Sequence, residues 1–127
     1  MKTKRSVLLI DDDAALREAL ASALADEGYS VHQAGNAADA KSWLARKAPD
    51  LIVVDVMMPD LNGIEFCRWL RSWGKLKATP VLMMSGLKDE ETVQDALELG
   101  VADFLRKPFA AKALLEKAAV LLTPRGD

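Results

Sequence analysis

The chain has 127 residues, of which half are hydrophobic and 28% are charged, as in an ordinary folded domain with its own core. Seventeen basic against nineteen acidic residues give a net charge of -2, which excludes a strongly basic nucleic-acid-binding protein. The single cysteine excludes a disulfide framework and a thiolate zinc site, and the single histidine excludes a site built on two imidazoles.

The N-terminal segment combines basic residues with a short apolar run, residues 7–10. That run is too short for the core of a signal peptide, and three aspartates follow it directly. No apolar stretch approaches the roughly 20 residues that a membrane-spanning helix needs. We therefore expect a cytoplasmic protein that does not associate with a membrane. We expect residues 1–127 to form one domain, with residues 123–127 as a tail or the start of a linker.

Short apolar runs alternate with longer amphipathic segments along the chain. The runs typical of buried strands are residues 7–10, 29–34, 51–54, 80–84 and 101–105. The segments with helical periodicity run from 14 to a stop at Gly28, from an N-cap at Asn36 to Pro49, and over 64–73, 90–99 and 110–122. In segment 90–99 we expect Val93, Ala96 and Leu97 to face the core.

Five strand–helix units in succession indicate parallel strands joined by right-handed crossovers. We therefore predict an α/β fold of the flavodoxin-like, doubly wound (βα)5 type. Its five-stranded parallel sheet would have the order 2-1-3-4-5 and be flanked by five helices. Ligands of such sheets bind at the carboxyl ends of the strands, so the residues at those ends are the candidates for a functional site.

Polar side chains stand where the predicted strands end. They are Asp11, Asp12, Asp13, Asp55, Ser85 and Lys107. Acidic residues are common in loops and in first helical turns, which explains each aspartate singly. That explanation does not account for carboxylates from two strands meeting a lysine and a serine. Converging carboxylates repel unless a cation binds or a pKa rises, and oxygen ligands favour Mg²⁺.

Four short motifs occur at these strand ends, in order along the chain. They are VLLIDDD at 7–13, DVMMP at 55–59 followed by Asn62-Gly63, MSG at 84–86, and FLRKPF at 104–109. Together they resemble the response-regulator receiver domain (CheY-like) of bacterial two-component signal transduction, and the resemblance covers nearly the whole chain. It implies a phosphoacceptor of a two-component system or phosphorelay, and no enzyme beyond catalysis of its own phosphorylation and dephosphorylation.

The resemblance implies a phosphorylation and metal site. Asp55 would be the phosphoacceptor and become a 4-aspartylphosphate, by attack of its carboxylate on phosphorus. Asp11, Asp12, Asp55 and the backbone carbonyl of Met57 would hold Mg²⁺, with Asp12 bound directly and Asp11 through water. Asp13 falls one place beyond the acidic pair, and we expect it at the start of a helix.

The resemblance also implies a switch. Lys107 would pair with Asp55 at rest and with a phosphoryl oxygen afterwards, while the Ser85 hydroxyl would move to another phosphoryl oxygen. The Lys107-Pro108 bond is often cis in this family. Phe104 stands where the family more often has tyrosine, and would turn inward on phosphorylation. A plain core position for Phe104 is the alternative.

Partners and signal lifetime follow from the same resemblance. The donor would be a histidine kinase or phosphotransfer protein. A downstream protein would bind the face made by segments 90–99, 101–105 and 110–122, with no direct contact to nucleic acid. We expect a monomer or a weak phosphorylation-dependent homodimer, because Ala102 and Ala113 replace acidic residues of the DNA-binding winged-helix members. Met57 and Leu87 are apolar and cannot position a hydrolytic water, so we expect slow self-dephosphorylation.

Three further features have structural interpretations first. His32 is expected to be structural or exposed, since no carboxylate lies near it in sequence. Cys67 is expected to be a small buried apolar residue. Phe66, Trp69 and Trp73 form a stripe that fits core packing, although part of it could be a partner surface.

Two other functions stay open at this point. A haloacid-dehalogenase-type phosphatase also ends its first strand in Asp-x-Asp, as Asp11 and Asp13 do, and would use the first-strand aspartate as nucleophile. That alternative leaves the motif at 55–59 unexplained and usually needs a longer chain. A receiver-like module that no longer takes phosphate is the second alternative, and the complete set of polar residues argues against it.

Overall fold

The computed structural model describes residues 4–86 and 90–123. The strands of the described chain are β1 (Ser6–Ile10), β2 (Ser30–Ala34), β3 (Leu51–Asp55), β4 (Val81–Ser85) and β5 (Asp103–Arg106). The helices are α1 (Ala14–Asp26), α2 (Ala37–Leu44), α3 (Gly63–Arg71), α4 (Glu90–Glu98) and α5 (Ala111–Leu121), with a short 3-10 helix η1 (Gly74–Leu76) after α3. Not one of these helices is long and apolar enough to cross a membrane.

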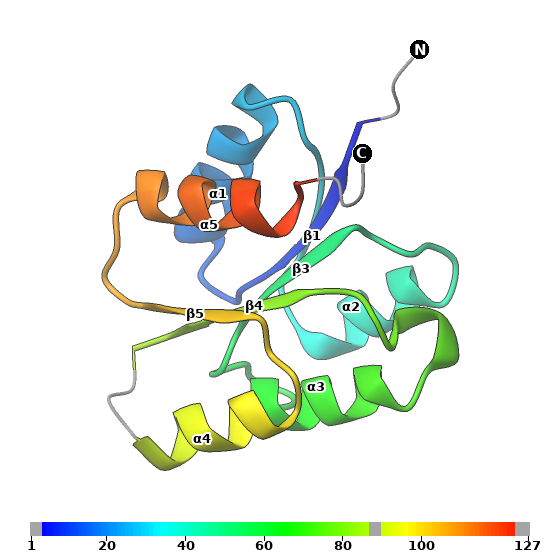
Figure 1. Cartoon of the computed structure of the whole chain (residues 1–127). Coiled ribbons are helices and arrows are strands. Elements are labelled where there is room, and N and C mark those ends of the chain that lie inside the picture. The colour runs from blue at the N-terminus through cyan, green and yellow to red at the C-terminus, as the bar shows by residue number, and fades with distance from the viewer. Residues whose placement is uncertain (1–3, 87–89, 124–127) are drawn as a thin grey trace.

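The strands form one parallel sheet in the order β2-β1-β3-β4-β5, which confirms the predicted flavodoxin-like fold. Helices α1 and α5 cover one face of the sheet, and α2, α3 and α4 cover the other (Figure 1). Neighbouring residues of a strand point to opposite faces. In β1, Leu8 and Ile10 therefore join the core under α2–α4, while Val7 and Leu9 join the core under α1 and α5.

Burial explains why the central strands read as continuous apolar runs. Every residue of β3 and β4 is buried, because helices cover both faces and neighbouring strands cover both edges. The edge strand β2 buries only Ala34, and its sequence is correspondingly more polar. The sheet thus fixes where each strand ends, and it brings the polar ends of β1, β3, β4 and β5 to one side of the molecule.

Side-chain caps mark the starts of α1, α2 and α3. The side chain of Asp13 accepts a hydrogen bond from the Leu16 amide (3.1 Å) and caps α1, so the prediction that Asp13 begins a helix is confirmed. Asn36 caps α2 in the same way, through the Asp39 amide at 2.8 Å, which was also predicted. A side-chain oxygen satisfies an amide that the first turn leaves without an intrahelical partner.

Several element boundaries differ from the predictions. The helix expected from Asn36 to Pro49 ends at Leu44. The predicted helix 64–73 ends at Arg71, because Trp73 adopts an extended conformation (φ -95, ψ 122) and η1 follows. The predicted strand 101–105 begins only at Asp103. Gly100 has φ +79 and the Val101 amide donates to the Ala96 carbonyl, so these two residues close the end of α4 instead of pairing in the sheet.

The prediction that Leu97 faces the core is wrong. Ala96 is fully buried and Val93 half-buried, but Leu97 is 52% exposed. Adjacent helical residues are about 100° apart around the axis, and α4 contributes a narrow stripe to the core. Position 97 consequently points away from the sheet.

Gly63 provides a test of how tightly α3 packs on the end of β3. A Cβ at this position would lie 2.7 Å from the Asp55 carbonyl oxygen and 2.8 Å from the Val56 Cα. We expect Gly63→Ala to lower the free energy of unfolding by about 1–3 kcal/mol, the usual cost of overpacking. Gly74→Ala is the matched control, since a Cβ there meets nothing within 4 Å. Equal urea midpoints for the two variants would contradict the expected close contact.

Candidate functional site

Three carboxylates gather at the carboxyl end of the sheet. Asp11 follows β1 and Asp55 ends β3, and the two strands are hydrogen-bonded neighbours although 44 residues separate these aspartates. Asp12 is the next residue along, and the three side chains place one carboxylate oxygen each within 4.8 Å of one another. Asp11 is fully buried and Asp55 is 5% exposed, whereas Asp12 faces solvent. The predicted ligand carboxylates are therefore side by side.

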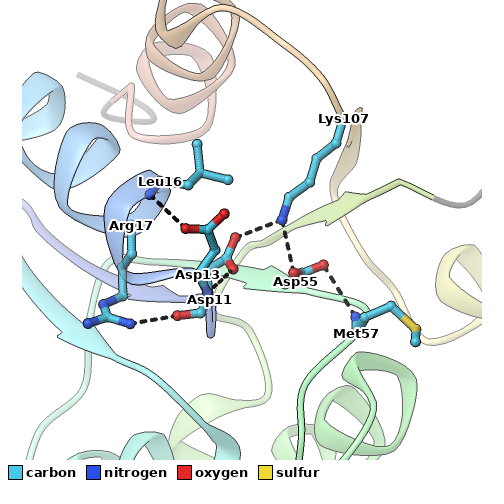
Figure 2. Close-up of polar contacts among 7 residues, drawn as sticks. All are labelled: Asp11, Asp13, Leu16, Arg17, Asp55, Met57 and Lys107. Carbon is cyan, nitrogen blue, oxygen red and sulfur yellow. Dashed lines mark hydrogen bonds and ion pairs between the residues drawn. The ribbon is translucent and has the colours of Figure 1, made fainter.

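Lys107 reaches into this cluster from the end of β5. Its Nζ lies 2.8 Å from Asp11 Oδ2 and 2.9 Å from Asp55 Oδ2 (Figure 2). The Lys107 amide donates to the Ser85 carbonyl at 2.8 Å, which holds the lysine beside the end of β4. The Lys107–Pro108 peptide bond is cis. One ammonium thus bridges two carboxylates that come from different strands.

The electrostatics of the cluster are unbalanced. Burial raises the pKa of Asp55, and the charge of Asp11 adds to this; the hydrogen bond from Lys107 opposes the rise without cancelling it. Burial would lower the pKa of Lys107, but its hydrogen bonds to Asp11 and Asp55 outweigh burial and raise that pKa. The lysine is therefore firmly charged, and among the described residues it is the one cation that forms ion pairs with these carboxylates.

The donor set fits a hard divalent cation. Carboxylate oxygens from Asp11, Asp12 and Asp55 converge, and oxygen ligands are those that Mg²⁺ prefers. Met57 lies in the loop after β3, where its amide donates to Asp55 Oδ1 at 3.3 Å and its side chain is 58% exposed. This bond keeps the backbone of Met57 next to the Asp55 carboxylate, which suits the predicted role of its carbonyl as a further ligand.

The predicted switch residues Ser85 and Phe104 lie on the two strands beyond β3. Ser85 ends β4, is 1% exposed, and pairs in register with Arg106 of β5. Phe104 is half-buried on β5, opposite Met83, and packs on the core under α2–α4. Leu87, the second predicted lifetime residue, lies outside the described residues. The structure thus brings Ser85 to the same end of the sheet as the carboxylates, with Phe104 further back along β5.

Two supporting residues have no signal in the sequence pattern. Arg17 on α1 donates from Nη1 to the Asp11 carbonyl at 2.8 Å (Figure 2). Asp60, in the loop after β3, accepts hydrogen bonds from the amides of Ala37 and Ala38. The Asp60 contacts span 22 and 23 residues of the chain, whereas the Arg17 contact spans only six. A charged residue on a surface helix or in a polar turn has no distinctive sequence pattern, so neither contact is evident from the sequence.

The remaining titratable candidates stand outside the site. His32 is exposed and stacks on Trp43, with ring centroids 4.9 Å apart; burial, together with the charges of Arg46 and Lys47, lowers its pKa. The predicted structural or exposed position is therefore confirmed. Cys67 is fully buried as predicted, and burial raises the pKa of its thiol to about 11, so the thiol stays protonated at neutral pH.

The aromatic stripe of α3 and the residues directly after it serves mainly as core. Phe66 is fully buried, and Trp69 and Trp73 are half-buried and pack against the same core cluster. The Trp69 and Trp73 rings lie 4.9 Å apart, and Lys41 Nζ of α2 sits 5.1 Å from the centre of the Trp69 ring. The expected core packing is thus confirmed for these three side chains.

Comparison with known families identifies one domain type. The family model described as the response regulator receiver domain matches residues 7–119. The chain is 39% identical over 118 residues to the transcriptional regulatory protein GltR of Pseudomonas aeruginosa, covering 93% of this chain and 49% of that protein. It is 41% identical over 116 residues to the response regulator MprA of Mycobacterium leprae, covering 91% of this chain and 50% of that protein. The chain spans about half the length of these curated relatives.

Solved structures agree with this assignment. The chemotaxis response regulator CheY4 of Vibrio cholerae superimposes with a TM-score of 0.89 at 32% sequence identity. The match covers 94% of this chain and 100% of that chain. The similarity therefore extends over nearly the whole chain.

The unbalanced charge predicts that Asp55→Asn stabilises the protein when divalent cations are absent. Because the folded-state pKa of Asp55 lies above the 3.8 of a free aspartate, its contribution to stability is full at low pH and is lost as the pH rises through that pKa. We expect the variant to unfold a few degrees higher at pH 7, with the gain fading at acidic pH. Thermal unfolding at several pH values measures this. Asp39→Asn, an exposed site, is the control, and a pH-independent gain would contradict the charge explanation.

Proposed function

Since the chain belongs to the response regulator receiver family of two-component systems, we propose that it accepts a phosphoryl group on Asp55 from a phosphohistidine donor. The observation that carries this proposal is the Asp11–Lys107–Asp55 bridge at the end of the sheet. It places a nearly buried carboxylate next to a fixed ammonium, at the strand ends where doubly wound sheets bind their ligands. The family is not a classical enzyme family, and the chemistry proposed here changes the protein itself.

The proposed step is a phosphoryl transfer that balances between two residues. A carboxylate oxygen of Asp55 forms a bond to phosphorus while the bond from phosphorus to the donor's imidazole nitrogen breaks, and the electron pair returns to that nitrogen. The Lys107 ammonium, already 2.9 Å from Asp55, would change partner and form an ion pair with a phosphoryl oxygen. The Ser85 hydroxyl, one strand further along the sheet, would donate to another phosphoryl oxygen.

Asp11, Asp12, Asp55 and the Met57 carbonyl would hold Mg²⁺, Asp12 directly and Asp11 through water. Bound there, Mg²⁺ would supply positive charge that offsets the repulsion between an anionic phosphoryl group and the carboxylates. The surplus negative charge of the cluster supports this assignment, since Lys107 alone does not compensate it. Asp12 is the solvent-exposed member of the cluster, so its carboxylate would bind the cation from the solvent side.

The expected donor is a histidine kinase or a phosphotransfer protein, as the relatives imply. A hollow of about 360 Å³ opens beside the cluster, lined by Leu16, Lys107, Pro108 and Phe109. Because Lys107 both lines this hollow and binds Asp55, a donor seated there would bring its histidine toward the phosphoacceptor. We propose this hollow of α1 and the β5–α5 connection as the donor's contact.

The proposed output is a change on the face formed by α4, β5 and α5. Movement of Ser85 toward the phosphoryl group would free space for Phe104 to turn inward, and a downstream protein would bind the altered face. The Lys117 ammonium lies 2.8 Å from Asp103, so α5 and β5 already neutralise part of this face within the chain. That pairing supports a monomer or a weak phosphorylation-dependent homodimer, without direct contact to nucleic acid.

The position of Asp13 argues against the haloacid-dehalogenase-type alternative. That chemistry would need both aspartates of an Asp-x-Asp pair in the site. Here the Asp13 carboxylate accepts from the Leu16 amide and caps α1, as Figure 2 shows. A receiver-like module without phosphorylation is left as the alternative that the next experiment excludes.

Acetyl phosphate or beryllofluoride with Mg²⁺ tests the phosphoacceptor directly. We expect wild type to gain the mass of one phosphoryl group, or to change its spectrum with beryllofluoride, and Asp55→Ala to lose the response completely. Asp39→Ala is the control for removal of an exposed carboxylate. Modification of Asp11 instead would favour the phosphatase alternative, and no modification of wild type would favour the non-phosphorylated module.

The side chain of Met57 predicts a long-lived acyl phosphate. A thioether cannot position water, so we expect a phosphoryl half-life of minutes or longer, measured by the decay of the phosphorylated mass. Met57→Asn retains the backbone carbonyl but adds a polar side chain, and we expect it to shorten the half-life several-fold. A wild-type half-life of only seconds would refute the prediction.

A further inference from the structure

The turn between β2 and α2, residues 34–38, supplies none of the proposed ligands, yet it contacts both loops that carry them. One of these loops follows β1 and contains Asp11 and Asp12. The other, residues 56–62, follows β3 and contains Met57. A cation held by two loops binds well only if their spacing is fixed beforehand, because ordering a loop on binding costs free energy.

On the β1 side, the turn and α1 hold the backbone of Asp11 from two directions. The Asp11 amide donates to the Ala34 carbonyl at 3.1 Å. Arg17 donates to the Asp11 carbonyl at 2.8 Å and to Gln33 Oε1 of β2 at 3.1 Å. Gly35 lies directly against the guanidinium, since a Cβ there would come within 3.2 Å of Arg17 Nη1. The Asp11 backbone is thereby tied to the end of β2.

On the β3 side, Asp60 ties the second loop to the same turn. Its Oδ1 accepts from the Ala37 amide at 3.0 Å and its Oδ2 from the Ala38 amide at 2.9 Å. These are the first two amides of α2, which have no intrahelical partner, and the helix dipole favours a carboxylate there. The two hydrogen bonds lower the pKa of Asp60, which is therefore ionised at neutral pH and binds as a charged acceptor.

Met57 lies between the two points at which the β3–α3 loop is fixed. At the base, the Gly63 amide donates to the Val56 carbonyl at 2.7 Å and closes the loop. At the tip, Asp60 is bound to α2. Without the contact at the tip, the segment that carries the Met57 carbonyl would keep its closed base but lose its attachment to the rest of the site.

We propose that the β2–α2 turn is a common support that sets the distance between the two ligand-bearing loops, and that Asp60 is the positioning residue on the β3 side. The proposal rests on the proposed function, because it concerns the same Mg²⁺ ligands. Asp60 touches neither the carboxylate cluster nor Lys107 in any recorded contact of the described chain, so it acts only through the loop.

Mg²⁺ titration by calorimetry at neutral pH tests the positioning role, with Asp39→Ala as matched control. Asp39 stands at the same helix end and carries the same charge, but the one hydrogen bond of its carboxylate within the described chain comes from the Asn36 amide group, at 3.4 Å. We expect Asp60→Ala to weaken Mg²⁺ binding about tenfold, as loss of an outer-shell partner does. Asp60→Asn keeps one acceptor oxygen, so its Mg²⁺ affinity should lie between those of wild type and Asp60→Ala. Asp39→Ala should bind Mg²⁺ like wild type.

Phosphorylation kinetics separate positioning from a role in the chemistry. With acetyl phosphate, Asp60→Ala should need more Mg²⁺ for half-maximal rate, while the rate at saturating Mg²⁺ should return to that of wild type, because Asp55, Ser85 and Lys107 are unchanged. A reduced rate at saturation would overturn the positioning role. Circular dichroism and urea unfolding check folding, and Asp60→Asn provides the same measurement if Asp60→Ala is poorly folded.

Arg17→Met tests whether the support is shared. Each single variant should weaken Mg²⁺ binding. The affinity of the Arg17→Met/Asp60→Ala double variant should fall by less than the product of the two single fold-changes, because the first substitution already removes the fixed spacing of the loops. Effects that simply multiply would overturn the common support. Equal affinity of Asp60→Ala and wild type would overturn the proposal while leaving the proposed function intact; a wild type that binds no Mg²⁺ would overturn both.

Discussion

The repulsion among Asp11, Asp12 and Asp55 is the constraint on which the rest of this structure depends. Two of these carboxylates are almost completely buried, where like charges are costly, and one lysine ammonium bridges them. Burial, with the charge of Asp11 added to it, raises the pKa of Asp55. The free energy of such a site therefore changes strongly when a cation binds or a covalent group is added. Proteins accept such local instability where function requires it and compensate elsewhere in the fold.

The compensation comes from the sheet and from the helices on both faces. Strands β1, β3 and β4 are buried by apolar side chains on either side, so the backbone that carries the charges is rigid. The loops beyond the strand ends are held in turn by contacts to neighbouring segments: Arg17 holds the first loop and Asp60 the second. Rigid strands, with loops that are each held by hydrogen bonds, can keep the repelling carboxylates a short distance apart, which a mobile loop could not do.

Much of this arrangement could be predicted from local patterns. The apolar runs identified the strands, and the caps Asp13 and Asn36 marked two helix starts, because a cap is an interaction between residues three apart. Leu97 was predicted to be buried and is exposed, since the periodicity of α4 does not reveal how narrow its contact with the sheet is. Arg17 and Asp60 could not be found either, because the partners of Asp60 lie 22 and 23 residues away in sequence.

By itself, the sequence determined the order of elements, the fold class and the residues that stand at the strand ends, because these depend on periodicity and on short-range chemistry. The predicted strand order already placed β1 beside β3, and the structure confirms it. Only the tertiary structure decided that Lys107 bridges Asp11 and Asp55 from the end of β5, at 2.8 and 2.9 Å. It also decided how deeply each carboxylate is buried. Distances and burial arise from contacts between segments far apart in the chain, and those contacts set the pKa values and the positions of the loops.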